Sequence, residues 1–148
     1  MREILFRGKR LSDGEWVTGY YIQPTYHWHK RGIHKDWIAC GAVSNGGWLN
    51  LLQKYAVIPE TVGQYTGLTD KNGKKIFEGD IVRVDDDVKE TFPQVEDGDV
   101  RFARGGFFVG SYGDILRSLD VIADFKGVLR GEVIGNIHDN PELLTKEE

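Results

Sequence analysis

Glycines occur along the whole chain rather than in one segment. There are nineteen of them among 148 residues, and they separate short runs that are rich in aromatic and β-branched side chains. Glycine destabilises helices, and it permits the positive φ angles that tight turns require. The pattern therefore predicts many short β-strands joined by turns, and it argues against a fold built from long helices.

The predicted strands occupy the runs between the turn signals. Residues 3–7 and 16–22 flank the turn signal Ser12-Asp13-Gly14-Glu15, and we expect them to pair as a hairpin. Further strands are predicted at residues 38–43, 48–52, 55–58, 81–84, 100–103, 106–112 and 131–137. Strands of this spacing predict a mostly β fold, either a small barrel or an irregular two-sheet packing, with one or two short helices.

Helices are predicted only near the C-terminus. In residues 114–119, three apolar side chains fall on one helical face. Pro141 is expected to open a final helical turn. Residues 85–99 are strongly acidic and are predicted to form a solvated loop or a short, poorly ordered hairpin.

The remaining totals describe an ordinary globular chain. No internal repeat and no long linker is visible, so a single domain over residues 1–148 is predicted. The formal net charge is −4, whereas a general nucleic-acid binder is normally basic. The single cysteine, Cys40, cannot form an internal disulfide, which fits a reducing compartment. No apolar run approaches the ~20 residues of a membrane span, so we expect a cytoplasmic protein that does not contact membranes.

Side chains that bind soft metals gather in one part of the chain. They are His27, His29, His34 and Cys40, which are residue types that zinc accepts as ligands. His27 and His29 would share one face of a strand, but the spacing of the four matches no common zinc-binding pattern. We therefore predict no bound metal and no other cofactor. A metal-dependent enzyme that uses the three histidines remains an alternative hypothesis.

The same part of the chain interleaves aromatic rings with positive charge. The residues are Tyr26, Trp28, Lys30, Arg31, Lys35 and Trp37. Single-stranded nucleic acid is bound in this way, with bases stacked on rings and phosphates beside cations. Exposed aromatic residues also mark protein interfaces. The acidic total charge favours packing of the tryptophans onto the core or a neighbouring subunit over nucleic-acid binding. We predict a contact surface for a protein partner here, with nucleic-acid binding and simple packing of the tryptophans into the core as alternatives.

Motifs that would indicate catalysis are missing from the sequence. There is no Gly-x-Ser-x-Gly nucleophile motif, and neither pair of adjacent glycines is followed by the Lys-Ser or Lys-Thr of a phosphate-binding loop. The acidic residues between 85 and 99 lack the order of ligands found in an EF-hand. The sequence therefore predicts a binding protein rather than an enzyme.

Three blocks of the sequence have a distinctive content and order. The first is Arg2-Glu3-Ile4-Leu5-Phe6-Arg7, the second extends from Gly63 to Val82, and the third extends from Glu132 to Leu144. The second block contains Thr-Gly-Leu, Asp-Lys-Asn-Gly and Glu-Gly-Asp-Ile, in that order. In their content and joint presence the blocks resemble the YopX family of phage and prophage proteins, and the resemblance covers most of the chain.

The resemblance implies a mostly β fold and self-association into a homo-oligomer. It implies no enzymatic activity, cofactor or catalytic residue. The resulting hypothesis is a non-enzymatic phage or prophage accessory protein in the cytoplasm of a bacterial host, which binds a host protein, a phage protein or its own copies. Within the blocks, Asp70 and Asp80 are expected to accept hydrogen bonds from backbone amides in tight turns rather than to do chemistry.

Overall fold

The computed structural model describes residues 3–23, 35–39, 55–93, 95–110 and 116–144. The chain divides into two compact units, Met1–Gln64 and Tyr65–Glu148, and each is considered by itself below. The predicted mostly β fold is confirmed. It takes the two-sheet form rather than that of a barrel, because the described strands form two antiparallel sheets that do not close.

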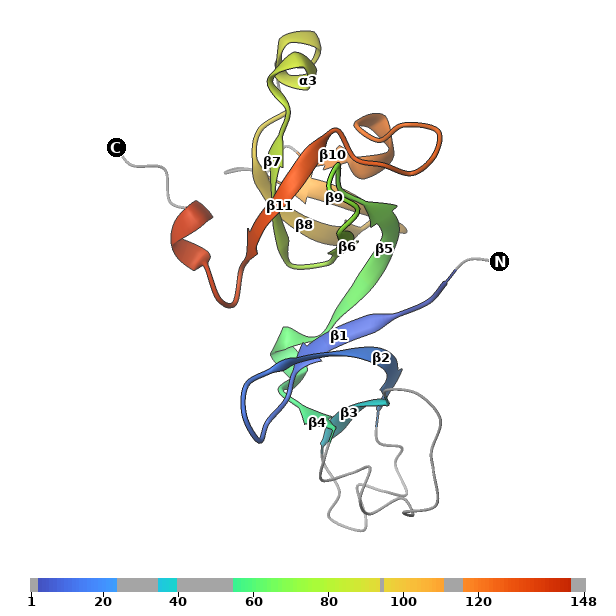
Figure 1. Cartoon of the computed structure of the whole chain (residues 1–148), viewed down its shortest axis with the longest axis vertical. Helices are drawn as coiled ribbons and strands as arrows, with labels where there is room; N and C mark the ends of the chain where they lie inside the picture. The colour runs from blue at the N-terminus through green and yellow to red at the C-terminus, as the bar shows by residue number, and fades with distance from the viewer. Residues whose placement is uncertain (1–2, 24–34, 40–54, 94, 111–115, 145–148) are drawn as a thin grey trace. The chain divides into compact units, whose positions relative to one another are not determined.

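The N-terminal unit is built around its first strand. Its strands are β1 (Phe6–Lys9), β2 (Trp16–Ile22), β3 (Asp36–Ala39), β4 (Ala56–Val57) and the first residues of β5 (Gly63–Thr69). A short 3₁₀ helix, η1 (Pro59–Thr61), connects β4 to β5. Strand β1 lies between β2 and β5, with Phe6 opposite Gly19 on one side and opposite Gln64 on the other (Figure 1). The predicted hairpin of the first two strands is confirmed.

Small residues allow these strands to pack closely. A Cβ atom added to Gly8 of β1 would lie 3.2 to 3.3 Å from Ile38, Val57 and Val62. Ile38 and Val57 are fully buried. The core of the N-terminal unit therefore forms on the face of the sheet to which Gly8 belongs.

The C-terminal unit contains the second sheet. Its remaining strands are β6 (Lys75–Phe77), β7 (Asp80–Val84), β8 (Gly98–Ala103), β9 (Gly106–Gly110), β10 (Leu116–Ser118) and β11 (Gly131–Asn136). The helical segments are α3 (Asp86–Thr91) and the 3₁₀ helices η2 (Leu119–Val121) and η3 (Pro141–Leu144). The last of these confirms the helical turn predicted at Pro141. Strand β5 continues into this unit, where it pairs with β6.

The two units repeat one topology. The strand order is β4-β3-β2-β1-β5 in the N-terminal unit and β10-β9-β8-β7-β11 in the C-terminal unit. In each unit four strands follow one another across the sheet, a 3₁₀ helix comes next, and the fifth strand returns to pair with the first. Both fifth strands begin with a Gly-x-x-x-Gly sequence, at Gly63 and at Gly131. The sequences share little else, so the repeat is visible only in the strand pairing.

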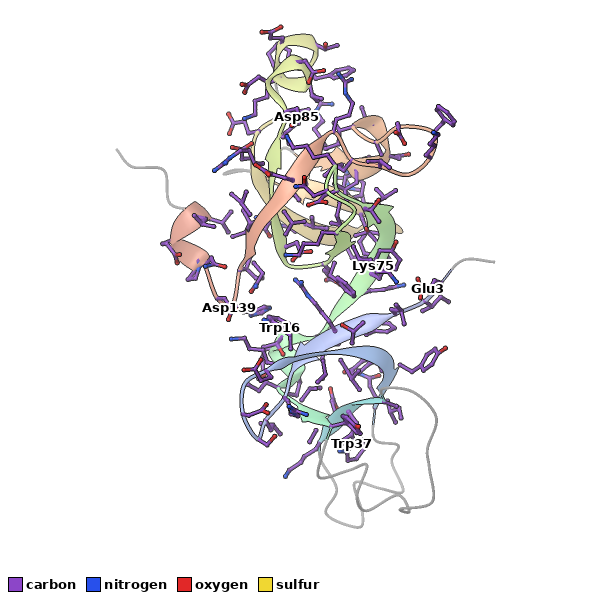
Figure 2. The ribbon with its side chains drawn as sticks, in the orientation of Figure 1. Glu3, Trp16, Trp37, Lys75, Asp85 and Asp139 are labelled. Carbon is purple, nitrogen blue, oxygen red and sulfur yellow. The ribbon has the colours of Figure 1, made fainter. Side chains whose placement is uncertain are left out.

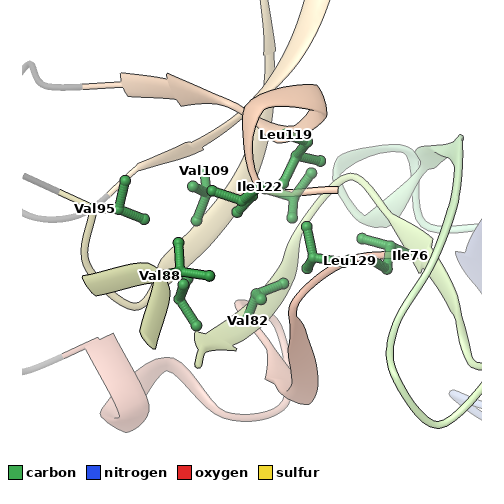
Figure 3. Packing of buried hydrophobic residues seen from close by; sticks show 10 residues of the cluster. Ile76, Val82, Val88, Val95, Val109, Leu119, Ile122 and Leu129 are labelled. Carbon is green, nitrogen blue, oxygen red and sulfur yellow. The ribbon is translucent and has the colours of Figure 1, made fainter. Parts of the chain in front are cut away.

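One apolar cluster forms the core of the C-terminal unit. Ten side chains that are each at most 3% exposed make it up. They are Ile76, Val82, Val84, Val88, Val95, Val100, Val109, Leu119, Ile122 and Leu129 (Figure 3). Burying one such side chain contributes about 1.5–3 kcal/mol, so this cluster is the main source of stability in the unit. The sheet supplies four of the valines, and α3, η2 and the segments that follow them supply most of the rest.

Two glycine-containing turns form hairpins in different sheets, one between β8 and β9 and the other between β5 and β6. Arg104 and Gly105 both have positive φ angles, of 50° and 80°, which is the type I′ geometry that joins β8 to β9 as predicted. An Asn-Gly pair favours positive φ at both residues, but in the Asn72-Gly73 turn only Gly73 adopts it, at 81°. The amide of Asp70 donates to the carbonyl of Lys74. The loop between these two residues is therefore one residue longer than the loop of a two-residue hairpin.

The helix predicted at residues 114–119 is wrong over the part that the structure describes. Residues 116–118 form β10, in which Arg117 lies opposite Val109, and only Leu119–Val121 turns into a 3₁₀ helix. A short apolar run is compatible with both a helix and a strand. Here the strand forms because the run pairs with the edge of β9. Leu119 is buried, as the apolar pattern required.

The acidic stretch contains a helix that was not predicted. Residues 86–91 form α3, although a loop or a hairpin was expected there. Two aspartates in the first turn favour the helix by their interaction with its dipole. Val88, its one fully buried side chain, anchors the helix to the core. One apolar residue among so many charges was too weak a periodic signal to detect.

Candidate functional site

Charge is divided unevenly between the two units. Residues 1–64 carry eight Lys and Arg against five Asp and Glu, a net charge of +3, whereas residues 65–148 carry eleven against eighteen, a net charge of −7. All four tryptophans also belong to the N-terminal unit. The total of −4 therefore conceals a basic, tryptophan-rich unit followed by an acidic one. Asymmetry of this kind between two halves of a chain points to electrostatic recognition of a partner.

One face of the N-terminal sheet combines cations with aromatic rings. Arg7 and Lys9 are two residues apart on β1 and so share a face, and the register places Trp16 opposite Lys9. The guanidinium of Arg7 lies 4.7 Å from the centroid of the Trp16 ring, and the ammonium of Lys9 lies 5.7 Å from it (Figure 2). Tyr20 follows on the same face of β2 and is 65% exposed. We call Arg7, Lys9, Trp16 and Tyr20 the basic–aromatic face.

This face was not predicted from the sequence. The signal was present, because Arg-x-Lys and Trp-x-x-x-Tyr alternate correctly within two strands that were predicted to pair. It was missed because residues 26–37 contain a denser run of aromatic and basic residues, and the binding surface was predicted there instead. Arg7, Lys9 and Trp16 are half-buried, and two guanidinium nitrogens of Arg7 are buried, so these cation–π contacts mainly orient the side chains.

A hydrogen-bond network joins β2 to β3, on either side of the chain segment that carries most of the predicted contact residues. The Tyr21 hydroxyl donates a 2.5 Å hydrogen bond to a carboxylate oxygen of Asp36, at the start of β3, and the Gln23 amide donates to the Tyr21 oxygen. Burial and the bond to Asp36 raise the pKa of Tyr21. The network links the end of β2 to the start of β3.

The six predicted contact residues have different outcomes. Tyr26, Trp28, Lys30 and Arg31 lie outside the residues that the structure describes. Lys35 is exposed, as a contact residue should be. Trp37 is only 3% exposed, and it lies on β3, where it pairs with Ile22 and Ala56 (Figure 2). The structure therefore assigns Trp37 to the core of the unit, and the binding role of the segment remains a prediction.

The candidate metal ligands of the alternative hypothesis cannot be placed. His27, His29, His34 and Cys40 all lie outside the described residues. Within the described residues, no three His, Cys, Asp or Glu side chains come together in a way that would hold a metal ion. Over the same part of the chain, no helix is long and apolar enough to cross a membrane.

The acidic stretch around α3 is engaged in ion pairs. Lys71 contacts Asp85 at 2.7 Å, and Lys89 contacts Asp97 at 2.9 Å. Arg130 pairs with Asp87. All of these side chains are partly or largely exposed, so each pair contributes little to stability. The pairs hold α3 beside the neighbouring segments and leave no chelating arrangement of carboxylates among the described residues.

The buried carboxylates of the second sequence block serve the backbone, as predicted. Asp70 accepts hydrogen bonds from the amides of Asn72 and Lys74 in its own turn, each at 2.9 Å, and from Val133 of β11 at 3.0 Å. Asp80 accepts one from the amide of Phe77 at 2.8 Å. Both carboxylates are 1% exposed. These groups hold turns and strands together, and the arrangement gives them no access to a substrate.

The fold and the site together define a small, two-unit antiparallel β protein with a basic aromatic surface on its first unit. Comparison with protein families identifies it further. The model described as YopX protein matches residues 5–145, so the chain belongs to the YopX family. The resemblance seen in the three sequence blocks is confirmed.

Comparison with solved structures finds a similar protein. The crystal structure of protein EF1440 from Enterococcus faecalis is 25% identical in sequence and superposes with a TM-score of 0.54. The alignment covers 98% of this chain and 100% of that one. None of the curated proteins matches this chain.

Proposed function

We propose that this YopX-family protein is a phage-type accessory protein of the bacterial cytoplasm that works by binding and not by catalysis. Its N-terminal unit makes the contact, and its partner is a protein with an acidic surface. The observation that carries this proposal is the division of charge and tryptophan between the units. A positively charged surface attracts an acidic protein surface, and Tyr20, the exposed aromatic side chain among the described residues of this unit, provides an anchor for it.

Tyr20 and Lys35 are the best positions at which to test this role. Both are exposed, so alanine substitution removes contact groups without opening a cavity. We expect Tyr20→Ala with Lys35→Ala to weaken the partner complex by about tenfold or more, because an aromatic anchor and a cation are lost together. The measurement is affinity capture from the host bacterium, followed by titration of the purified partner. Trp37 is unsuitable for this purpose because its removal would damage the core.

The matched control is Phe102→Ala with Lys74→Ala in the C-terminal unit. This pair also removes one exposed aromatic ring and one exposed cation. It is expected to leave the affinity unchanged. If both double variants lose affinity equally, or if neither loses affinity, the N-terminal unit is not the contact surface.

Single-stranded nucleic acid is the second candidate partner. The local net charge of +3 removes the objection that the total charge of −4 raised against it. If this alternative holds, labelled oligonucleotide titrations will show affinity that falls steeply with salt, with a slope of about −0.7 for each phosphate contacted. Absence of binding at low salt would eliminate nucleic acid and leave the protein partner.

A further inference from the structure

The second copy of the repeated topology contains a segment that the first copy lacks. In the N-terminal unit a single residue, Val62, separates η1 from the fifth strand. In the C-terminal unit nine residues, 122–130, separate η2 from β11. The N-terminal unit forms the same strand arrangement without these residues, so the topology itself does not require them.

The tip of this segment is a tightly bonded turn. The amide of Asp124 donates to the carbonyl of Val128 at 2.9 Å, and that of Gly127 donates to the carbonyl of Asp124 at 3.0 Å. The carboxylate of Asp124 accepts from the amides of Lys126 and Val128, at 2.8 and 3.0 Å. Gly127 adopts a φ of 79°, which few other residues tolerate. We call residues 124–128 the Phe125 turn.

The turn is also fastened to strand β5. The amide of Thr69 donates to the carbonyl of Gly127 at 3.1 Å, and the amide of Leu129 donates to the carbonyl of Thr69 at 2.7 Å. Leu129 is fully buried in the core. The base of the turn is therefore held by the sheet and the core of its own unit.

This well-fixed turn presents an apolar side chain to water. Phe125 is 95% exposed, more than any other large hydrophobic residue that the structure describes. Lys126 lies beside it, with its ammonium 5.8 Å from the ring centroid. Val121, in the same part of the chain, is 53% exposed. A pre-ordered aromatic side chain binds with a small loss of conformational entropy, which is a property of the anchor residues of interfaces.

We propose that Phe125 is the anchor of a self-association contact, in which the Phe125 turn of one molecule docks on the N-terminal unit of a second copy. Charge complementarity selects this occupant, because the unit that bears Phe125 has a net charge of −7 and the receiving unit has a net charge of +3. The same negative charge disfavours nucleic acid and anionic lipid. The N-terminal unit also exposes apolar side chains that can receive the ring, at Ile4, Leu11 and Tyr20.

The contact joins two different surfaces, so it is a heterologous interface and generates a ring or a chain of molecules rather than a two-fold dimer. It rests on the proposed binding role of the N-terminal unit, and it names the partner of that unit as the protein itself.

The test is sedimentation velocity of the full chain over a wide range of protein and salt concentrations. The wild-type protein is expected to associate with rising protein concentration and to dissociate as salt screens the opposite charges. Phe125→Ala is expected to weaken association by about 30-fold, the loss typical of an aromatic anchor. Asp124→Ala keeps the ring but releases the turn, and it is expected to weaken association to a smaller extent.

The control is Phe102→Ala, which removes another exposed ring from the same unit and is expected to leave association unchanged. Circular dichroism of each variant confirms that it is folded. A wild-type protein that stays monomeric at every concentration would overturn the inference, as would association that Phe125→Ala does not alter. Neither result affects the capture experiment with Tyr20→Ala and Lys35→Ala, so failure of self-docking is distinguishable from failure of the proposed binding role.

Discussion

Replacing Asp70 with alanine is expected to lower the free energy of unfolding of the C-terminal unit by about 3–4 kcal/mol. The carboxylate is 1% exposed and accepts three backbone hydrogen bonds. Its removal takes the acceptor from the amides of Asn72, Lys74 and Val133, whose bonds to it are partly buried. A hydrogen bond to a charged group contributes about 1.5–3 kcal/mol. Urea unfolding gives the total loss, and hydrogen exchange at the three amides locates it.

The control for this prediction is Asp124→Ala. Asp124 also accepts hydrogen bonds from two backbone amides, but its side chain and these amides are exposed. Water replaces the lost acceptor there, so the expected loss is about 1 kcal/mol or less. A similar loss in the two variants would contradict the central role that we assign to the buried carboxylate.

Asp70 is also expected to make the stability of the C-terminal unit depend on pH. Burial by itself raises the pKa of Asp70, but the backbone amides of Val133, Lys74 and Asn72 and the charge of Lys74 together outweigh burial and hold this pKa below its ordinary value. A carboxyl group with a lowered pKa stabilises the folded state above its unfolded pKa of about 4, and this contribution is lost as the pH falls through the folded pKa. Unfolding curves of the wild type should show this loss below about pH 4, and those of Asp70→Asn should show a smaller one, because other carboxyl groups such as Asp13 also have a lowered pKa.

Replacing Gly19 with alanine is expected to have an effect of similar size in the N-terminal unit. A Cβ atom at this position would lie 2.0 Å from the backbone carbonyl oxygen of Ala39, on the neighbouring strand β3. Backbone cannot move aside as a side chain can, so the pairing of β2 with β3 must open. We expect a loss of about 3 kcal/mol, at the upper end of what overpacking costs. Tryptophan fluorescence is the measurement, because all four tryptophans belong to this unit.

The control here is Gly106→Ala. The nearest atom to an added Cβ at Gly106 is 3.7 Å away, on the side chain of Phe108, which is an ordinary contact. This substitution is expected to change the unfolding free energy very little. If Gly19→Ala is equally mild, the close approach of β2 and β3 is not as tight as the structure describes.

The features that could be predicted from the sequence were those with local causes. The hairpin of β1 and β2, the turn at Arg104-Gly105 and the hydrogen-bonding role of Asp70 all follow from residue types within a few positions of one another. Three sequence blocks were also enough to indicate the family. Turn chemistry depends on neighbouring residues, so a single sequence contains most of the information that it requires.

The features that escaped prediction depend on distant partners. Trp37 ends a run in which aromatic and basic residues alternate, and that pattern suggested a surface residue. In the structure it lies on β3, between β2 and β4, and is only 3% exposed. The formation of β10 depends in the same way on the exposed edge of β9, and the repeated topology depends on which strand the fifth one joins. Pairing between residues far apart in the chain cannot be read from local patterns.

Strand β5 has a practical consequence for dissecting the protein. The boundary between the two units, after Gln64, falls inside this strand, which pairs with β1 through its first residues and with β6 through its last ones. Limited proteolysis usually cuts multidomain chains at exposed spacer peptides, whereas here the scissile bonds at the boundary belong to a hydrogen-bonded strand. Fragments cut at Gln64 would each lose part of a sheet, so a recombinant N-terminal fragment should retain the chain as far as Thr69.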